Sequence, residues 1–282
     1  MRIVGSFYRT KLVSACIEDS VPMTGDQLDE LIAKLRRLPS ESGVYHKILG
    51  ELRDPNGTLE QVGLLVGSDP AITVEVIKTV NSAAFGYSRT ICDPIDAVML
   101  LGGDQVLAIV LMVEVFGIQE GVKCLGFSFS RLLSHCRTVA WNSRGLMRQQ
   151  SKDRRLIGAA FTGGLLHDVG KLLLAANFPD DYGKCTDEGK EEHVFGASHA
   201  AIGARFLHRW QMPPAVVDTV GNHSRLSQSD DPELSLSDIV YVANAQAHYK
   251  QKTAPSGLSL SEQVLQLQER FGKECLATWG FK

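Results

Sequence analysis

The sequence predicts an all-α fold. Helix-start signals are frequent along the chain, apolar residues follow helical spacing, and no stretch alternates apolar and polar residues as a half-buried strand would. Capping boxes occur at residues 24–27 (Thr-Gly-Asp-Gln) and 58–61 (Thr-Leu-Glu-Gln). Asp69-Pro70 and Asp93-Pro94 each place a capping aspartate before a proline, which is favoured in the first turn of a helix.

The first half of the chain contains three helical segments with different apolar patterns. Residues 59–66 and 72–80 each carry one apolar stripe at helical spacing. Gly102-Gly103 predicts a helix end, after which Asp104 could cap the next helix. Residues 106–115 are apolar on nearly every side, which predicts a central buried helix, although their β-branched side chains leave a strand as an alternative.

The second half contains further helical segments, so we expect two helical sub-domains. Residues 135–146, 157–177, 199–210, 236–247 and 260–271 are predicted helices, and another begins at Pro213-Pro214. The polar stretch 180–192 and residues 253–257 are predicted loops. The predicted organisation is an N-terminal extension (1–30), an N-terminal helical sub-domain (31–120), a second helical sub-domain (121–252) and a C-terminal helix (253–282), with the junction at 117–127.

Composition restricts the class of protein. The 282 residues carry a formal net charge of −3, so we expect no nucleic acid as a partner. The six cysteines lack any CxxC pair, as free thiols in a reducing cytoplasm would. The N-terminus has no signal-peptide core, and the apolar run 106–116 contains Glu114 and is too short to span a bilayer. We therefore expect a cytoplasmic protein that does not bind membranes.

The most informative motif is His167-Asp168, followed three residues later by Lys171. An imidazole nitrogen beside a carboxylate can hold a divalent metal, and the lysine could meet an anionic substrate. Three more histidines, His135, His199 and His223, fall on apolar-facing helical rows. Buried histidines are costly unless their nitrogens are paired or ligated, so these side chains could converge on one polar point in a helical bundle.

The alternative is that each histidine is structural. A single buried histidine is more often a hydrogen-bonded core residue than a metal ligand, and the dipeptide by itself is a weak signal. We assign four of the eight histidines to this structural class: His46, His193, His208 and His248. The adjacent pair and the recurrence on four helical rows are what favour a metal site for the others.

These residues resemble the HD superfamily of metal-dependent phosphohydrolases. His135 matches the isolated first histidine of that pattern, and residues 167–171 (His-Asp-Val-Gly-Lys) match its HDxGK form. His199 resembles an extra histidine of the binuclear members, and His223 resembles the second residue of their HH pair. The resemblance implies that residues 121–252 form an HD-like helical bundle core.

The first half narrows the resemblance to the HDOD domain, an HD-related output domain of bacterial signalling proteins. The elements that carry it are residues 38–39 (LP), 66–72 (VGSDPAI), 80–86 (VNSAAFG) and 97–102 (AVMLLG), in this order. The resemblance extends from about residue 38 to about residue 249. It implies a regulatory or scaffolding module without an established general enzymatic activity, whose partner is a signalling protein or a phosphorylated small molecule.

Two positions depart from the HD pattern. Asn244 occupies the place of the final aspartate, and an amide is a weaker ligand than a carboxylate; the HH pair is Asn222-His223, again one ligand short. The resemblance therefore implies one metal, Fe, Mn, Zn or Mg, rather than two. His135, His167 and Asp168 would hold it, aided by His223 or His199.

We expect a signal-transduction HDOD module with a degenerate HD metal site. The alternative is a phosphohydrolase acting on a nucleotide or other phosphoester, in which Asp168 and Lys171 would be the catalytic residues. In a third interpretation the histidines serve packing alone. The sequence leaves the oligomeric state open.

Overall fold

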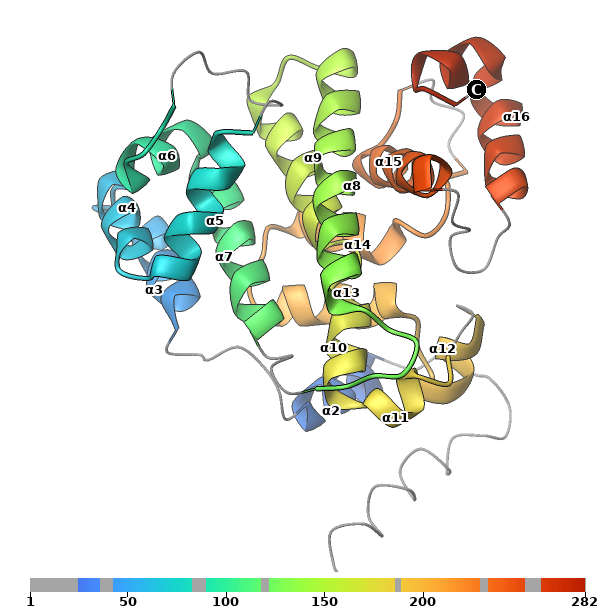
Figure 1. The fold of residues 1–282 in the computed structure, drawn as a ribbon, viewed down its shortest axis with the longest axis horizontal. Helices are drawn as coiled ribbons and strands as arrows, with labels where there is room; N and C mark the ends of the chain where they lie inside the picture. Colours follow the sequence, from blue (N-terminus) through green and yellow to red (C-terminus); the bar gives the residue numbers. More distant parts are fainter. Residues whose placement is uncertain are drawn as a thin grey trace, which may run out of the picture.

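The computed structural model describes residues 25–35, 43–82, 90–117, 122–185, 189–228, 233–251 and 260–281, and within them every regular element is a helix, as predicted (Figure 1). The helices are α2 (Gly25–Lys34), α3 (Val44–Arg53), α4 (Leu59–Gly67), α5 (Pro70–Val80), α6 (Pro94–Leu101), α7 (Gly103–Gly117), α8 (Phe129–Gln150), α9 (Arg154–Leu166), α10 (Val169–Asn177), α11 (Pro179–Tyr182), α12 (Gly189–Phe195), α13 (His199–Arg209), α14 (Pro214–Asn222), α15 (Leu236–Gln251) and α16 (Leu260–Thr278).

Side-chain caps fix several helix starts where the sequence predicted them. The Thr58 hydroxyl accepts the backbone N–H of Gln61 at 3.2 Å, which confirms Thr58 as the N-cap. The reciprocal half of the predicted capping box is absent among the described residues, because the Thr58 N–H is donated to the Glu51 carboxylate at 2.8 Å. The Asp93 carboxylate accepts the N–H of Ile95 at 2.7 Å, and Asp69 accepts that of Ile72 at 3.1 Å. The first capping box begins at Thr24, outside the described residues.

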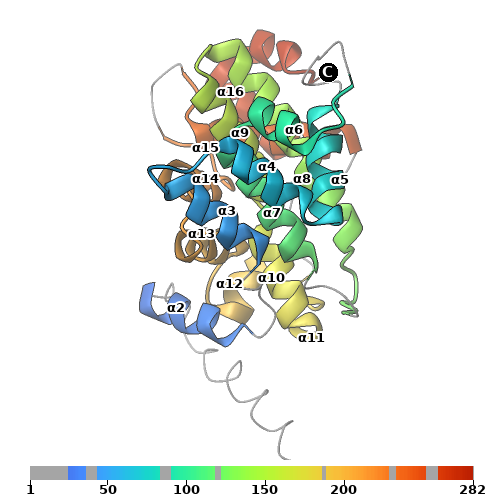
Figure 2. The same cartoon turned by 90° about the vertical axis from the view of Figure 1, so that its left-hand side faces the viewer.

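Helix α7 is the buried helix that the apolar run predicted. Its residues 106–112 are buried on all sides, and it contacts α3, α5, α6, α9 and α10. Figure 2 shows α3 beside α7. One continuous apolar core runs from these helices into α8, α9, α13 and α14, so both predicted sub-domains share it. Asp104 lies within the first turn of α7 instead of preceding it, because the helix already begins at Gly103.

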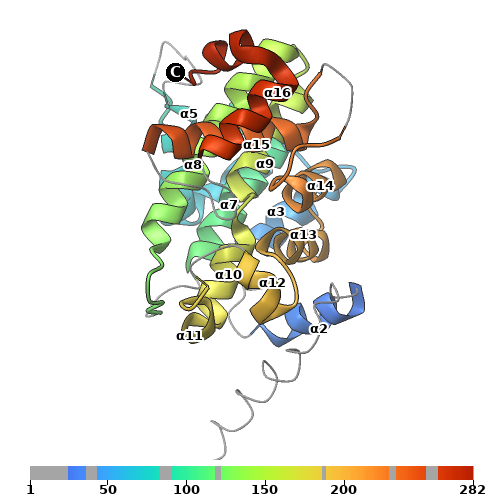
Figure 3. The ribbon, with the colours of Figure 1, turned by 90° about the vertical axis from the view of Figure 1, so that its right-hand side faces the viewer.

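The second half is organised around the close pair α8 and α9. A Cβ added to Gly164 on α9 would lie 2.7 Å from the Ser143 Oγ and 2.9 Å from the Ala140 Cα on α8, so only glycine allows this separation. Helix α15 packs on both helices and α16 on α15. Figure 3 shows α15 and α16 together at one end, with α10, α11 and α12 at the other.

Three predicted element boundaries are wrong. The predicted helix 157–177 is two helices, which break at His167 and Asp168 because α10 turns to approach α13. The predicted loop 180–192 contains α11 and the start of α12, short helices that tertiary contacts stabilise and periodicity cannot reveal. The last helix continues beyond residue 271 to Thr278.

Part of the predicted N-terminal extension belongs to the folded body. Helix α2 packs against α13, and an ion pair joins Asp29 to Arg205. Outside the described residues lie 1–24, residues 38–39, the end of the 80–86 motif, residues 118–121 of the predicted junction and the predicted loop 253–257.

No single described helix has both the length and the apolar character needed to span a bilayer. Taken together, α6 and the first part of α7 meet those criteria, but they meet at a bend of 116°.

Candidate metal centre

The predicted metal ligands come together from helices far apart in the sequence. His135 projects from α8, His167 and Asp168 occupy the break between α9 and α10, His199 begins α13, and His223 follows the last residue of α14. All five side chains are buried, His135 being the most exposed at 8%. The residues that sequence patterns predicted to converge therefore do so in the folded chain.

Asp168 is the centre of this cluster. The Nε2 of His167 lies 3.3 Å from its Oδ2, and the Nε2 of His199 lies 3.3 Å from its Oδ1. The Nε2 of His135 lies 3.9 Å from the Oδ2 of Asp168, and the Nε2 of His223 lies 3.7 Å from its Oδ1. Two triads of potential ligand atoms result, His135–His167–Asp168 and Asp168–His199–His223, with the atoms of each triad within 4.8 Å of one another.

The other ring nitrogen of three histidines fixes how the rings are turned. The Nδ1 of His167 lies 2.9 Å from the Gly164 carbonyl oxygen, and that of His223 lies 2.7 Å from the Val220 carbonyl oxygen. The Nδ1 of His199 lies 2.7 Å from the Glu191 carboxylate. Since these oxygens only accept hydrogen bonds, each Nδ1 carries a hydrogen and donates it, which turns the Nε2 of each ring toward Asp168. The Nε2 atoms of His199 and His223 also lie 3.4 Å from each other.

The protonation states make this arrangement electrostatically demanding. Burial lowers the pKa of His135 to about 3 and that of His223 to about 4, so both rings are neutral near pH 7. Burial favours a protonated Asp168, but the neighbouring His167 and Lys171 hold the pKa of its carboxyl well below the usual range. The neutral rings of His135 and His223 therefore lie beside an ionised carboxylate, an arrangement that a shared cation would stabilise.

Unsatisfied atoms support the fit to a metal. The Nε2 atoms of His135 and His167 are buried and have no hydrogen-bond partner within the described part of the chain. A buried polar atom without a partner costs free energy, and a bound divalent ion would satisfy both. Lys171 supplies one positive charge: its Nζ lies 3.1 Å from the Oδ1 of Asp168, and its side chain is 14% exposed.

Two further residues belong to the site and were not predicted. Glu191 on α12 is 3% exposed; its carboxylate accepts the ring N–H and the backbone N–H of His199 and the Tyr182 hydroxyl. His248 on α15, assigned above to the structural class, has its ring centroid 4.7 Å from that of His135. Its position one helical turn after Asn244 was a usable signal, whereas nothing distinguished Glu191 within its polar segment.

The remaining predicted positions are also located. The Oδ1 of Asn244 is buried and has no hydrogen-bond partner among the residues described, so a neutral oxygen replaces the expected carboxylate. His193 and His208 are exposed. The ring of His46 packs against Trp210 with centroids 4.7 Å apart, and its buried Nδ1 has no hydrogen-bond partner among the described residues.

Replacing Glu191 with glutamine should weaken metal binding by about 10- to 100-fold, because the amide orients His199 less strongly than a carboxylate does. The free energy of unfolding should fall by about 1–3 kcal/mol, since part of a buried hydrogen-bond network is lost. Metal titration and urea unfolding measure the two effects. The exposed neighbour substitution Glu192→Gln is the matched control; equal metal affinities in the two variants would contradict the orienting role.

The chain is similar to known proteins in sequence and in fold. An uncharacterized protein of Treponema pallidum is 24% identical over 228 residues, which is 78% of this chain and 42% of that protein, so the chain spans about two fifths of its curated relative. An HDOD domain protein of unknown function from Geobacter sulfurreducens has a TM-score of 0.66 at 22% identity, covering 90% of this chain and 87% of the other.

Two further solved structures show the same fold. A candidate phosphohydrolase from Shewanella amazonensis has a TM-score of 0.64 at 22% identity, covering 93% and 96% of the two chains. A candidate signal transduction protein from Marinobacter aquaeolei has a TM-score of 0.52 at 19% identity, covering 91% and 65%. The model of the HDOD domain family matches residues 38–226. Because that match covers well over half of the chain, the protein belongs to the HDOD domain family.

Proposed function

We propose that this protein is a regulatory HDOD module of bacterial signal transduction that holds one divalent metal in its HD-like cluster and binds a protein partner or a small phosphorylated ligand. The observation that carries this proposal is the burial of the cluster. His167 is 0% exposed, and Asp168, His199 and His223 are each 2% exposed. Structural metal sites are closed in this way, whereas catalytic sites keep a position open to water and substrate.

The ligand set indicates which metals fit. His135, His167 and Asp168 would hold the ion, with His223 or His199 completing the coordination. Imidazole nitrogen suits iron, zinc and related transition metals, whereas Mg²⁺ prefers oxygen ligands and keeps several waters. Iron, manganese and zinc are therefore favoured over magnesium.

The departures from the HD pattern also favour regulation over turnover. Asn244 offers a neutral oxygen where the HD pattern has a carboxylate, and Asn222 precedes His223 where a second histidine would stand. Each change lowers the expected affinity of the site for a second metal ion. Membership of the HDOD family supports the same interpretation, as does the fold shared with a candidate signal transduction protein.

A metal-dependent phosphohydrolase is the second candidate, and the triad Asp168–His199–His223 favours it, because it places further ligand atoms beside the first triad. A bound divalent ion would supply Lewis acidity and a water of lowered pKa. Asp168 would anchor the ion, and Lys171 would bring positive charge to the phosphate. The fold shared with a candidate phosphohydrolase supports it.

A hydrolysis panel separates the two functions. The full chain, loaded in turn with iron, manganese, zinc and magnesium, is assayed on nucleoside mono-, di- and triphosphates, cyclic nucleotides and nitrophenyl phosphates. We expect no turnover above that of Asp168→Ala, together with an increase in melting temperature on metal loading. Turnover that Asp168→Ala abolishes would establish the phosphohydrolase and contradict the regulatory proposal.

A further inference from the structure

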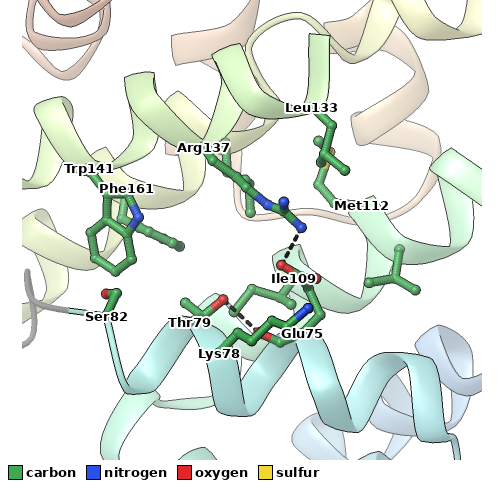
Figure 4. Close-up of a pocket in the computed structure, with 12 residues that line it drawn as sticks. Glu75, Lys78, Thr79, Ser82, Ile109, Met112, Leu133, Arg137, Trp141 and Phe161 are labelled. Carbon is green, nitrogen blue, oxygen red and sulfur yellow. Dashed lines mark hydrogen bonds and ion pairs between the residues drawn. The ribbon is translucent and has the colours of Figure 1, made fainter. Parts of the chain in front are cut away.

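A cavity lies outside the metal centre. Its volume is about 380 Å³, and its walls come from α5 and α7 on one side and from α8 and α9 on the other (Figure 4). None of the metal-centre residues lines it. Most of the lining is apolar, including Ile109 and Val113 from α7 and Phe161 and Leu165 from α9. Cavities of this size, with apolar walls and a few polar groups, are typical of small-molecule sites.

One end of the cavity is aromatic. The rings of Trp141 and Phe161 lie with their centroids 4.9 Å apart at an interplanar angle of 58°. Figure 4 shows Ser82 below the Trp141 ring. Its Oγ is buried and has no hydrogen-bond partner within the described residues, so it can donate to a ligand. This end therefore offers a face for a flat ring and one free polar group.

Ser82 is held in place by the residue before it. The Asn81 side chain donates from Nδ2 to the Ile91 carbonyl oxygen at 2.6 Å and accepts the Ile91 N–H at 2.8 Å. These two bonds clamp the end of α5 to a segment ten residues further along the chain. In the Asn-Ser pair of the 80–86 motif, Asn81 therefore has a structural role and Ser82 lines the cavity.

The rim of the cavity has an excess of positive charge. Arg137 on α8 pairs with Glu75 on α5, as the dashed line in Figure 4 marks. Lys78, one turn after Glu75, is exposed and has no ion-pair partner among the residues described. Two cations and one carboxylate leave a single positive charge. A monoanion would neutralise this rim, whereas a dianion such as a phosphate monoester would leave it negative.

We propose that this cavity binds a small aromatic carboxylate. The ring would pack between Trp141 and Phe161 at one end and the aliphatic walls from α7 and α9, where burial of flat apolar surface supplies most of the affinity. The carboxylate would pair with Lys78 at the rim, through a charge-assisted hydrogen bond. This site is independent of the metal centre and of the function proposed for it.

Calorimetric titration of the full chain with three matched probes tests the proposal. Naphthoate, naphthylmethanol and naphthyl phosphate share one ring system and differ in charge. We expect naphthoate to bind the most tightly. Lys78→Gln should weaken naphthoate by about tenfold and leave naphthylmethanol unchanged. Lys47→Gln removes the same charge from an exposed position on α3, which does not line the cavity, and should change neither.

A variant whose cavity is filled by a larger side chain provides a second test. Val113→Trp places a large side chain into the space, and a variant that melts cooperatively should bind none of the three probes. The proposal is overturned if naphthoate fails to bind the wild-type chain at millimolar concentration, if it binds no tighter than naphthylmethanol, or if Lys78→Gln leaves its affinity unchanged. Tighter binding of naphthyl phosphate would also overturn it, because the charge argument requires a monoanion.

Discussion

Replacing Asp168 with alanine should abolish metal binding. Asp168 contributes an oxygen to both ligand triads, and within the described part of the chain it is the carboxylate that the two triads share. We expect about one equivalent of iron, manganese or zinc in wild-type protein purified without a histidine tag, and background levels in the variant, since neutral imidazoles alone do not offset the cation's charge. Elemental analysis by mass spectrometry measures the content directly.

Asp218→Ala is the matched control for this substitution. Asp218 is exposed on α14, so its loss should leave the metal content unchanged. The melting temperature of each variant shows whether it remains folded, because Asp168→Ala also leaves Lys171 without the carboxylate it contacts at 3.1 Å. Wild-type protein that holds no metal, even after reconstitution with each ion, would contradict the metal centre and leave the histidines structural.

Replacing Gly170 with alanine should destabilise the protein severely. A Cβ at this position would lie 2.0 Å from the carbonyl oxygen and 2.8 Å from the carbonyl carbon of His199, and 3.0 Å from the Gly203 nitrogen. These are backbone atoms, so α10 and α13 must separate. We expect a loss of about 3 kcal/mol or more in the free energy of unfolding, measured in urea.

Gly145→Ala makes the same chemical change where space is available. Gly145 lies within α8, and a Cβ there would meet nothing within 4 Å. Alanine should stabilise this helix by about 0.5–1 kcal/mol, because glycine loses more backbone entropy on folding. If Gly170→Ala were as stable as Gly145→Ala, the close approach of α10 to α13 would be wrong. Since His199 begins α13, a folded Gly170→Ala variant should also bind metal less tightly.

The helices that the sequence predicted correctly are those in which the capping residues and the apolar spacing agree with the burial in the folded chain. The Thr58 and Asp93 caps and the all-round apolar α7 could be read directly, because capping and apolar patterning act within a few residues. Where local signals conflict with tertiary contacts, prediction failed. The helix break at His167 and Asp168 lies inside an apolar stretch, and no side-chain cap marks it. After the break, Gly170 packs against the backbone of His199, a tertiary contact that local patterns do not reveal.

The candidate site divides in the same way. His135, His167, Asp168, His199 and His223 were identified because histidine on an apolar helical row is chemically conspicuous. Glu191 was not identified, because a glutamate in a polar segment is ordinary until the fold buries it against His199. His248 was assigned to packing, and only the crossing of α15 over α8 brings its ring to His135.

Sequence patterns predict the helical class, the position of the central buried helix and the residue types available to a metal. These depend on short-range spacing, which a linear chain displays. Only helix packing brings the Nε2 atoms of four histidines to one carboxylate, buries Glu191 against His199, and lines a cavity with residues of α5, α7, α8 and α9. Such features depend on distances between residues far apart in the chain, which helix packing sets and periodicity does not encode.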